Sequence, residues 1–339
     1  MQTKARMVTL ERAWERISDG GRGEALLGEG PGRLTAAYAN FIVDRTWPSA
    51  LLEFPLRGAP TYDVLVGGYG GALRSGARIS AKGQDTAQRA VDWLVARGSA
   101  GLDLFFELDA IAADGQSAGI HCKHDGRPDD VRGFFEAIGI PAYALTYQRM
   151  WDRLPEGWDP FYAAVFPGRV DAPARMELLL DERVRLEASR DPSVLARGFG
   201  AIGFDAYDDA MLETCSRLLA LGRVAGLQLD LMPDGSVGDT VSLPFYLEEY
   251  GGDPTPDFMG RPEVHRMMCE LVRLGLSDGR HELIGGALFA GERLARSRVG
   301  RVYVIGTCVT ATCAKIKWRG GRPDPAKFYL TISKKVYPL

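Results

Sequence analysis

The sequence predicts an α+β fold: a closed ten-stranded antiparallel β-barrel, built from five ββ hairpins and surrounded by a ring of α-helices. Two kinds of segment follow one another along the chain. Paired segments have apolar and polar residues at alternate positions, as in strands, and the segments between them have apolar residues three and four positions apart, as in helices. The strand pair recurs five times, at intervals of roughly 50–75 residues. Hairpins in series form antiparallel sheet, and a long sheet covered by helices on one face removes its exposed edges by closing.

The elements follow one another in a regular order. Helices are expected near 8–18, 33–46, 86–97, 128–139, 142–153, 191–202, 206–222, 262–274 and 281–296. Strand pairs are expected at 50–57 with 62–69, 101–110 with 117–124, 159–167 with 174–182, 225–233 with 240–249, and 312–319 with 325–334. Segment 299–311 fits either an extra strand or a buried connection.

The bulk composition is that of one globular unit. We expect a single domain over residues 1–339, with 1–48 forming N-terminal helices that lead into the barrel. The net charge of -3 argues against nucleic-acid binding, which needs clustered cations. No apolar stretch reaches the ~20 residues of a membrane helix, and the N-terminus has no secretory apolar core. The five cysteines do not suggest a disulfide framework, so a cytoplasmic location is expected.

The alternation within each strand separates an apolar face, assigned to the helix layer, from a polar face that should point into the barrel. Inward aromatic residues are few: Phe105, Tyr246, Tyr329 and one of Phe161 and Tyr162. The expected inward cations are Lys123, Arg175, Lys315, Lys317 and Lys327. The expected inward carboxylates are Glu53, Asp63, Asp103, Glu107, Asp109, Glu177, Asp181, Asp230 and Glu248. The sequence therefore predicts a polar, acidic lumen, unless the polar face simply meets solvent in an open sheet.

Three short segments resemble a known family. They are Leu51-Leu52-Glu53-Phe54 on the first strand, Gly119-Ile120-His121-Cys122-Lys123 in the second hairpin, and Ala326-Lys327-Phe328-Tyr329-Leu330 on the last strand. With the repeated hairpins and helices, the chain from about residue 33 onward resembles the ABBA-type (αββα, PT-barrel) aromatic and peptide prenyltransferases. The resemblance implies an enzyme that moves a dimethylallyl or geranyl group from its diphosphate to an aromatic or peptide side-chain acceptor.

The resemblance also implies roles for individual residues. Glu53 would be the catalytic base, with Glu107 as the second candidate. Aromatic and polar side chains would shield the allylic cation or contact the substrate: Phe105, Tyr246, Tyr329, Gln228 and Asp230. Cations would contact the diphosphate: Lys123, Arg175, Lys315, Lys317 and Lys327. Apart from the resemblance, an acidic lumen suits a Mg²⁺ ion as a cofactor, with no tightly bound cofactor and no metal-ligating residues predicted.

Two other functions remain open from the sequence. An acidic lumen would also suit a basic peptide, in a peptide-binding protein or a peptide-tailoring enzyme that keeps the barrel without prenyl chemistry. The other function is that of a half-exposed sheet, covered by helices on one side, that binds a partner protein on the other.

Overall fold

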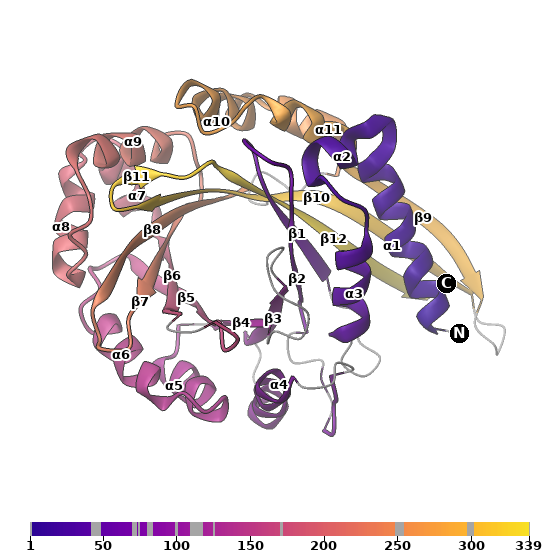
Figure 1. Cartoon of the computed structure of the whole chain (residues 1–339), viewed down its shortest axis with the longest axis horizontal. Coiled ribbons are helices and arrows are strands. Elements are labelled where there is room, and N and C mark those ends of the chain that lie inside the picture. Colours follow the sequence, from indigo (N-terminus) through magenta and orange to yellow (C-terminus); the bar gives the residue numbers. More distant parts are fainter. Residues whose placement is uncertain are drawn as a thin grey trace.

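A computed structural model of the protein describes residues 2–41, 49–69, 73, 75–79, 84–98, 101–108, 118–124, 126–169, 172–247, 254–296 and 302–338. Ten strands form a closed antiparallel barrel, as the sequence predicts (Figure 1). The ring closes because β10 pairs with β8 on one side and β12 on the other, while β12 pairs with β1. The barrel strands are β1 (Ser49–Pro55), β2 (Asp63–Gly67), β3 (Asp103–Leu108), β4 (Gly119–Lys123), β5 (Trp158–Val165), β6 (Ala174–Leu180), β7 (Gly226–Leu231), β8 (Val237–Tyr246), β10 (Val302–Arg319) and β12 (Lys327–Pro338). Because the ring of strands is closed, the alternative of an open sheet with its polar face in solvent is excluded.

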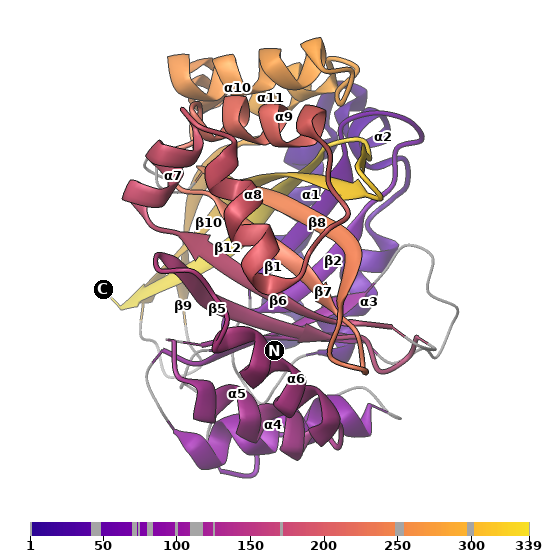
Figure 2. The same cartoon turned by 90° about the vertical axis from the view of Figure 1, so that its left-hand side faces the viewer.

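Helices lie around the outside of the barrel (Figures 1 and 2). Proline stands in the first turn of α5, α6 and α10, where its missing N–H breaks no helical bond. The helices are α1 (Gln2–Ser18), α2 (Arg22–Leu27), α3 (Gly32–Asn40), α4 (Asp85–Arg97), α5 (Pro128–Ala137), α6 (Pro141–Trp151), α7 (Glu182–Ala188), α8 (Ser193–Ile202), α9 (Asp209–Leu219), α10 (Pro262–Arg273) and α11 (Ile284–Ala287). None of these described helices has both the length and the hydropathy to cross a bilayer.

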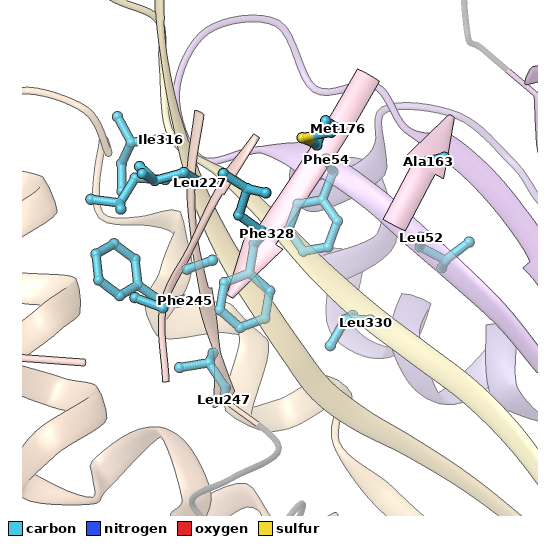
Figure 3. Close-up of a cluster of buried hydrophobic side chains, with 14 of the residues drawn as sticks. Leu52, Phe54, Ala163, Met176, Leu227, Phe245, Leu247, Ile316, Phe328 and Leu330 are labelled. Carbon is cyan, nitrogen blue, oxygen red and sulfur yellow. The ribbon is translucent and has the colours of Figure 1, made fainter. Parts of the chain in front are cut away.

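The main core lies between the outer face of the barrel and the helices. Figure 3 shows side chains of this layer, among them Phe54 and Phe328, whose ring centroids are 5.9 Å apart. Both rings are fully buried, as are Leu52 and Leu330 on the same two strands. Because side chains alternate across a strand, burying this face turns the intervening residues into the barrel. The two faces are those that the sequence predicts.

Several segments differ from the sequence-based prediction, which did not include helix α7 between the expected strand 174–182 and the expected helix 191–202. The helix expected over 281–296 is only a short 3-10 turn (Arg280–Leu283) and α11, followed by strand β9 (Phe289–Arg296). Segment 299–311 is largely the first half of β10, and that half pairs with β9. Backbone pairing with a long neighbouring strand outweighs the weak helical preference of 289–296, which also contains Gly291. β9 therefore extends the sheet beyond the barrel rather than adding to its wall.

The outer core should dominate stability. Phe328→Ala would leave a cavity in a fully buried site, and we expect it to lower the free energy of unfolding by about 3–5 kcal/mol. Urea denaturation measures this change. The matched control is Leu145→Ala on α6, where the side chain is 63% exposed and the expected change is within about 0.5 kcal/mol. Equal losses in the two variants would contradict the assignment of the core.

Candidate functional site

The barrel encloses a cavity of about 550 Å³, a size that suits a small ligand. Most of the predicted site residues line it: Glu53, Phe105, Glu107, Lys123, Arg175, Gln228, Tyr246, Lys315 and Tyr329. Lys317, Lys327 and Asp230 also lie on inward strand positions but are not part of this wall. The wall has other members that were not predicted as site residues, including Leu179, Val224, Thr312 and Cys313.

The strand register gives the cavity two different ends. At the end with the five hairpin turns, Glu53 is paired across the sheet with Asp63, Arg175 with Asp230, and Lys315 with Lys327. At the opposite end, Lys123 closes β4 and Tyr246 closes β8. Most charged side chains of the cavity therefore gather near the hairpin turns together with Tyr329, while the other aromatic side chains and Lys123 lie toward the other end.

Glu53 organises the charged end. Its carboxylate lies 2.5 Å from Lys327 Nζ and 3.6 Å from Lys315 Nζ. Lys327 also pairs with Asp63 at 3.5 Å, and Lys315 Nζ lies 5.0 Å from the centre of the Tyr329 ring. Burial raises the pKa of Glu53, but the two ammonium groups outweigh it and lower that pKa to about 2. Glu53 is therefore ionised throughout the physiological range.

A second cluster joins β3, β4 and the loop after β5. Glu107 Oε2 lies 2.6 Å from His121 Nε2, and Glu107 Oε1 lies 3.8 Å from Arg169. Arg169 and Arg175 both stack on the Phe166 ring, with their guanidinium carbons 4.0 and 4.3 Å from its centre. Neither residue was marked from the sequence: Phe166 was expected within the strand 159–167 but follows the end of β5, and Arg169 lies in the turn beyond it.

Aromatic rings form a continuous strip at the other end. Ring centroids are 5.9 Å apart for Phe105 and Tyr162, 4.3 Å for Tyr162 and Phe161, and 5.8 Å for Phe161 and Tyr246. Lys123 Nζ lies 5.6 Å from the centre of the Phe161 ring. Strict alternation allows only one of Phe161 and Tyr162 to face inward, but an irregularity of β5 between Pro160 and Tyr162 places both on the wall. The aromatic wall is therefore larger than the sequence predicts.

Glu177 lies between these two regions. Gln228 Nε2 donates to its carboxylate at 2.9 Å, and the Tyr246 hydroxyl donates to the other oxygen. Burial raises the pKa of Glu177, and the nearby charges of Lys315 and His121 offset only part of that rise. Glu177 and Glu53 thus hold protons with very different affinity within one cavity.

The cavity wall is balanced in charge, which corrects the prediction of an acidic lumen. Among the described residues, three carboxylates line it, Glu53, Glu107 and Glu177, against three cations, Lys123, Arg175 and Lys315. The other six predicted carboxylates are not among the described residues of the cavity wall. Asp63 pairs with Lys327, Asp230 with Arg175 at 3.3 Å, Asp103 accepts the Leu104 N–H, Asp181 caps α7, and Asp109 and Glu248 lie outside the described residues.

The cavity carboxylates do not fit a metal ion held by protein ligands alone. Within the described ranges, no group of three His, Cys, Asp or Glu side chains could hold one. Glu53, Glu107 and Glu177 each already accept from protein donors. Mg²⁺ as a cofactor stays a prediction.

No protein-family model matches the chain, and no curated protein matches it either. Solved structures with a similar course of the chain include a 5-dimethylallyltryptophan synthase from Streptomyces coelicolor, at 13% identity and a TM-score of 0.47 over 97% of this chain and 91% of that one. The prenyltransferase PriB with L-tryptophan and dimethylallyl thiolodiphosphate matches at 13% identity and a TM-score of 0.45, over 97% of this chain and 90% of that one. AnaPT from Neosartorya fischeri matches at 11% identity and a TM-score of 0.40, over 89% of this chain and 81% of that one. Strand pairing within this chain itself establishes the barrel.

The Glu53 cluster should control stability in acid. Glu53→Gln would leave Lys315 buried without its carboxylate, while Lys327 keeps Asp63, so we expect a loss of about 3 kcal/mol in unfolding free energy at pH 7. The native pKa of Glu53 is about 2, against 4.5 for a free side chain. Its contribution is therefore complete above about pH 4.5 and is lost as the pH falls toward 2.

Urea denaturation between pH 2 and 7 tests this expectation, since the difference between wild type and Glu53→Gln should shrink as the pH falls. Glu187→Gln on α7 is the control, because its side chain is 51% exposed and its carboxylate pairs with Arg183 at the surface. A Glu53→Gln variant as stable as wild type at pH 7 would contradict the account of this cluster.

Proposed function

We propose that the protein is a prenyltransferase-like enzyme that transfers a dimethylallyl or geranyl group from its diphosphate to an aromatic acceptor. The observation that supports this most is the two-ended cavity. Lys315 and Arg175 line one end, and a strip of four aromatic rings lines the other together with Lys123, inside a closed barrel. An allylic diphosphate has the same division, with an anionic head and an apolar tail that becomes cationic when the head departs.

The charged end supplies donors for the leaving group. Lys315 and Arg175 are on the cavity wall, and Lys327 is held beside Lys315 by Glu53. As the bond between the allylic carbon and the diphosphate oxygen breaks, negative charge grows on the diphosphate. Fixed ammonium and guanidinium groups stabilise that charge without reorganising, and they do so more strongly in a cavity than in water.

The aromatic strip suits the other product of this bond cleavage. The faces of Phe and Tyr rings attract cations, and contacts shielded from water are worth about 2 kcal/mol each. Tyr329 lies under Lys315, so it could contact the allylic group near the diphosphate. A closed barrel also limits access of water, which would otherwise capture the cation.

An aromatic acceptor fits this cavity better than a basic peptide. A planar ring can stack on the Phe105–Tyr246 strip. A basic peptide would need a surplus of carboxylates, and the described wall has equal numbers of both charges. A peptide whose aromatic side chain enters the barrel remains within the proposal.

Donor binding is the direct test. Isothermal titration calorimetry with dimethylallyl and geranyl thiolodiphosphate, with and without Mg²⁺, should show micromolar binding to the wild type. Lys315→Met keeps the length of the side chain but removes its charge, and we expect it to weaken binding by about tenfold or more.

Arg132→Met on the surface of α5 is the matched control, because this side chain is 56% exposed and pairs with Asp129 at the surface, and binding should not change. If neither analogue binds the wild type, with or without Mg²⁺, the proposed function is wrong.

A further inference from the structure

The three carboxylates of the cavity wall differ in their partners. Glu53 forms ion pairs with two lysines, and Glu107 forms an ion pair with Arg169 and lies 2.6 Å from His121 Nε2. Glu177 is held by neutral donors, the Gln228 amide and the Tyr246 hydroxyl. Within the described part of the chain, no ion pair involves Glu177. It is therefore the cavity carboxylate that can change its charge without breaking a salt bridge.

Its position also differs from that of the other two. Glu177 is directly across the strands from Tyr162 on β5 and from Gln228 on β7. Tyr246 links it to the aromatic strip, because the same side chain contacts the Phe161 ring. An aromatic acceptor stacked on the strip would thus present its edge to the Glu177 carboxylate, with the charged end of the cavity beyond it.

We propose that Glu177 is the catalytic base of the transfer reaction, an inference that rests on the proposed function. The bond between the allylic carbon and the diphosphate oxygen breaks, and its electron pair leaves with the diphosphate. An electron pair of the acceptor forms the new bond to the allylic carbon. The proton displaced from the acceptor atom then passes to the Glu177 carboxylate, which restores a neutral acceptor.

The electrostatics agree with this assignment. A base must be ionised before the reaction and must hold a proton well after it, and the optimum lies near the working pH. Glu53, with a pKa of about 2, holds a proton poorly, whereas burial raises the pKa of Glu177. The charged groups that favour its ionised form are Lys315, His121 and Arg175. Two carboxylates whose surroundings separate their pKa values commonly divide such roles, one staying ionised and one exchanging the proton.

Release of diphosphate from dimethylallyl diphosphate measures the reaction with indole, with phenol, or with water alone as the acceptor. Glu177→Gln is nearly isosteric, and we expect kcat to fall by about 100-fold or more. The Kd for dimethylallyl thiolodiphosphate, measured by calorimetry, should stay within about threefold of the wild type, since the base acts on the acceptor. Glu213→Gln, an exposed substitution on α9, should change neither quantity.

The pH profile separates catalysis from a merely structural role. Wild-type kcat should decline as the pH falls below the pKa of Glu177, and Glu177→Asp should keep this decline at a lower rate. Gln228→Leu removes a donor that favours the ionised form, so it should move the decline to higher pH. Glu177→Gln should abolish the decline in whatever rate remains.

The possible results are distinct. If Glu177→Gln keeps the wild-type rate and the acid decline, the assignment of the base is wrong while the transferase proposal stands. If Glu177→Gln loses both its activity and its binding of the analogue, the assignment of the base is also wrong, because Glu177 would then be needed to bind the donor. If the wild type binds the analogue but releases no diphosphate above the uncatalysed rate with any acceptor, both the catalysis and the base are refuted. No analogue binding by the wild type refutes the proposed function itself.

Discussion

The pairing of β10 with both β8 and β12 is the constraint on which the rest of the structure depends. It converts a ladder of hairpins into a ring, so the sheet has an inside. Once apolar residues such as Phe54 and Phe328 are buried under the helices, their neighbours Glu53 and Lys327 must face the interior. The cavity and its polar wall are therefore consequences of the same alternation that forms the core.

Burying charge in that interior is costly unless each group has a partner. The barrel meets this cost with short networks across neighbouring strands: Glu53 with Lys327 and Lys315, Arg175 with Asp230, and Glu107 with His121. Pairing leaves the wall close to neutral, while the cations stay close to the cavity. A ligand with an anionic head would compete with resident carboxylates for these cations, which favours a multiply charged head such as a diphosphate over a single carboxylate.

The sequence was sufficient for the parts of the fold that depend on local periodicity. The ten barrel strands and the inward direction of Lys315, Tyr329 and Gln228 could be predicted, because a period of two fixes the face of each residue. β9 could not, since only its pairing with β10 makes that segment extended. The inward turn of both Phe161 and Tyr162 was missed for a similar reason, because a local irregularity of β5 overrides the alternation.

The charge of the lumen was mispredicted from side-chain type alone. Asp181 lies on the inward period of β6 but caps α7, where its carboxylate accepts the Val184 N–H at 2.6 Å. Glu177 differs from Glu53 through its partners rather than its place in a pattern, and those partners come from β7 and β8, some 50 to 70 residues along the chain. The partners contributed by distant strands thus decide which carboxylate has the raised pKa, and a single sequence does not show those contacts.

The central claim is that one small ligand spans both ends of the cavity. A crystal structure of the protein with dimethylallyl thiolodiphosphate tests it most directly. The account predicts the diphosphate between Lys315 and Arg175, with the dimethylallyl carbons toward Tyr329 and the aromatic strip. A saturated crystal with the ligand outside the barrel, or with its diphosphate among the aromatic rings, would contradict it.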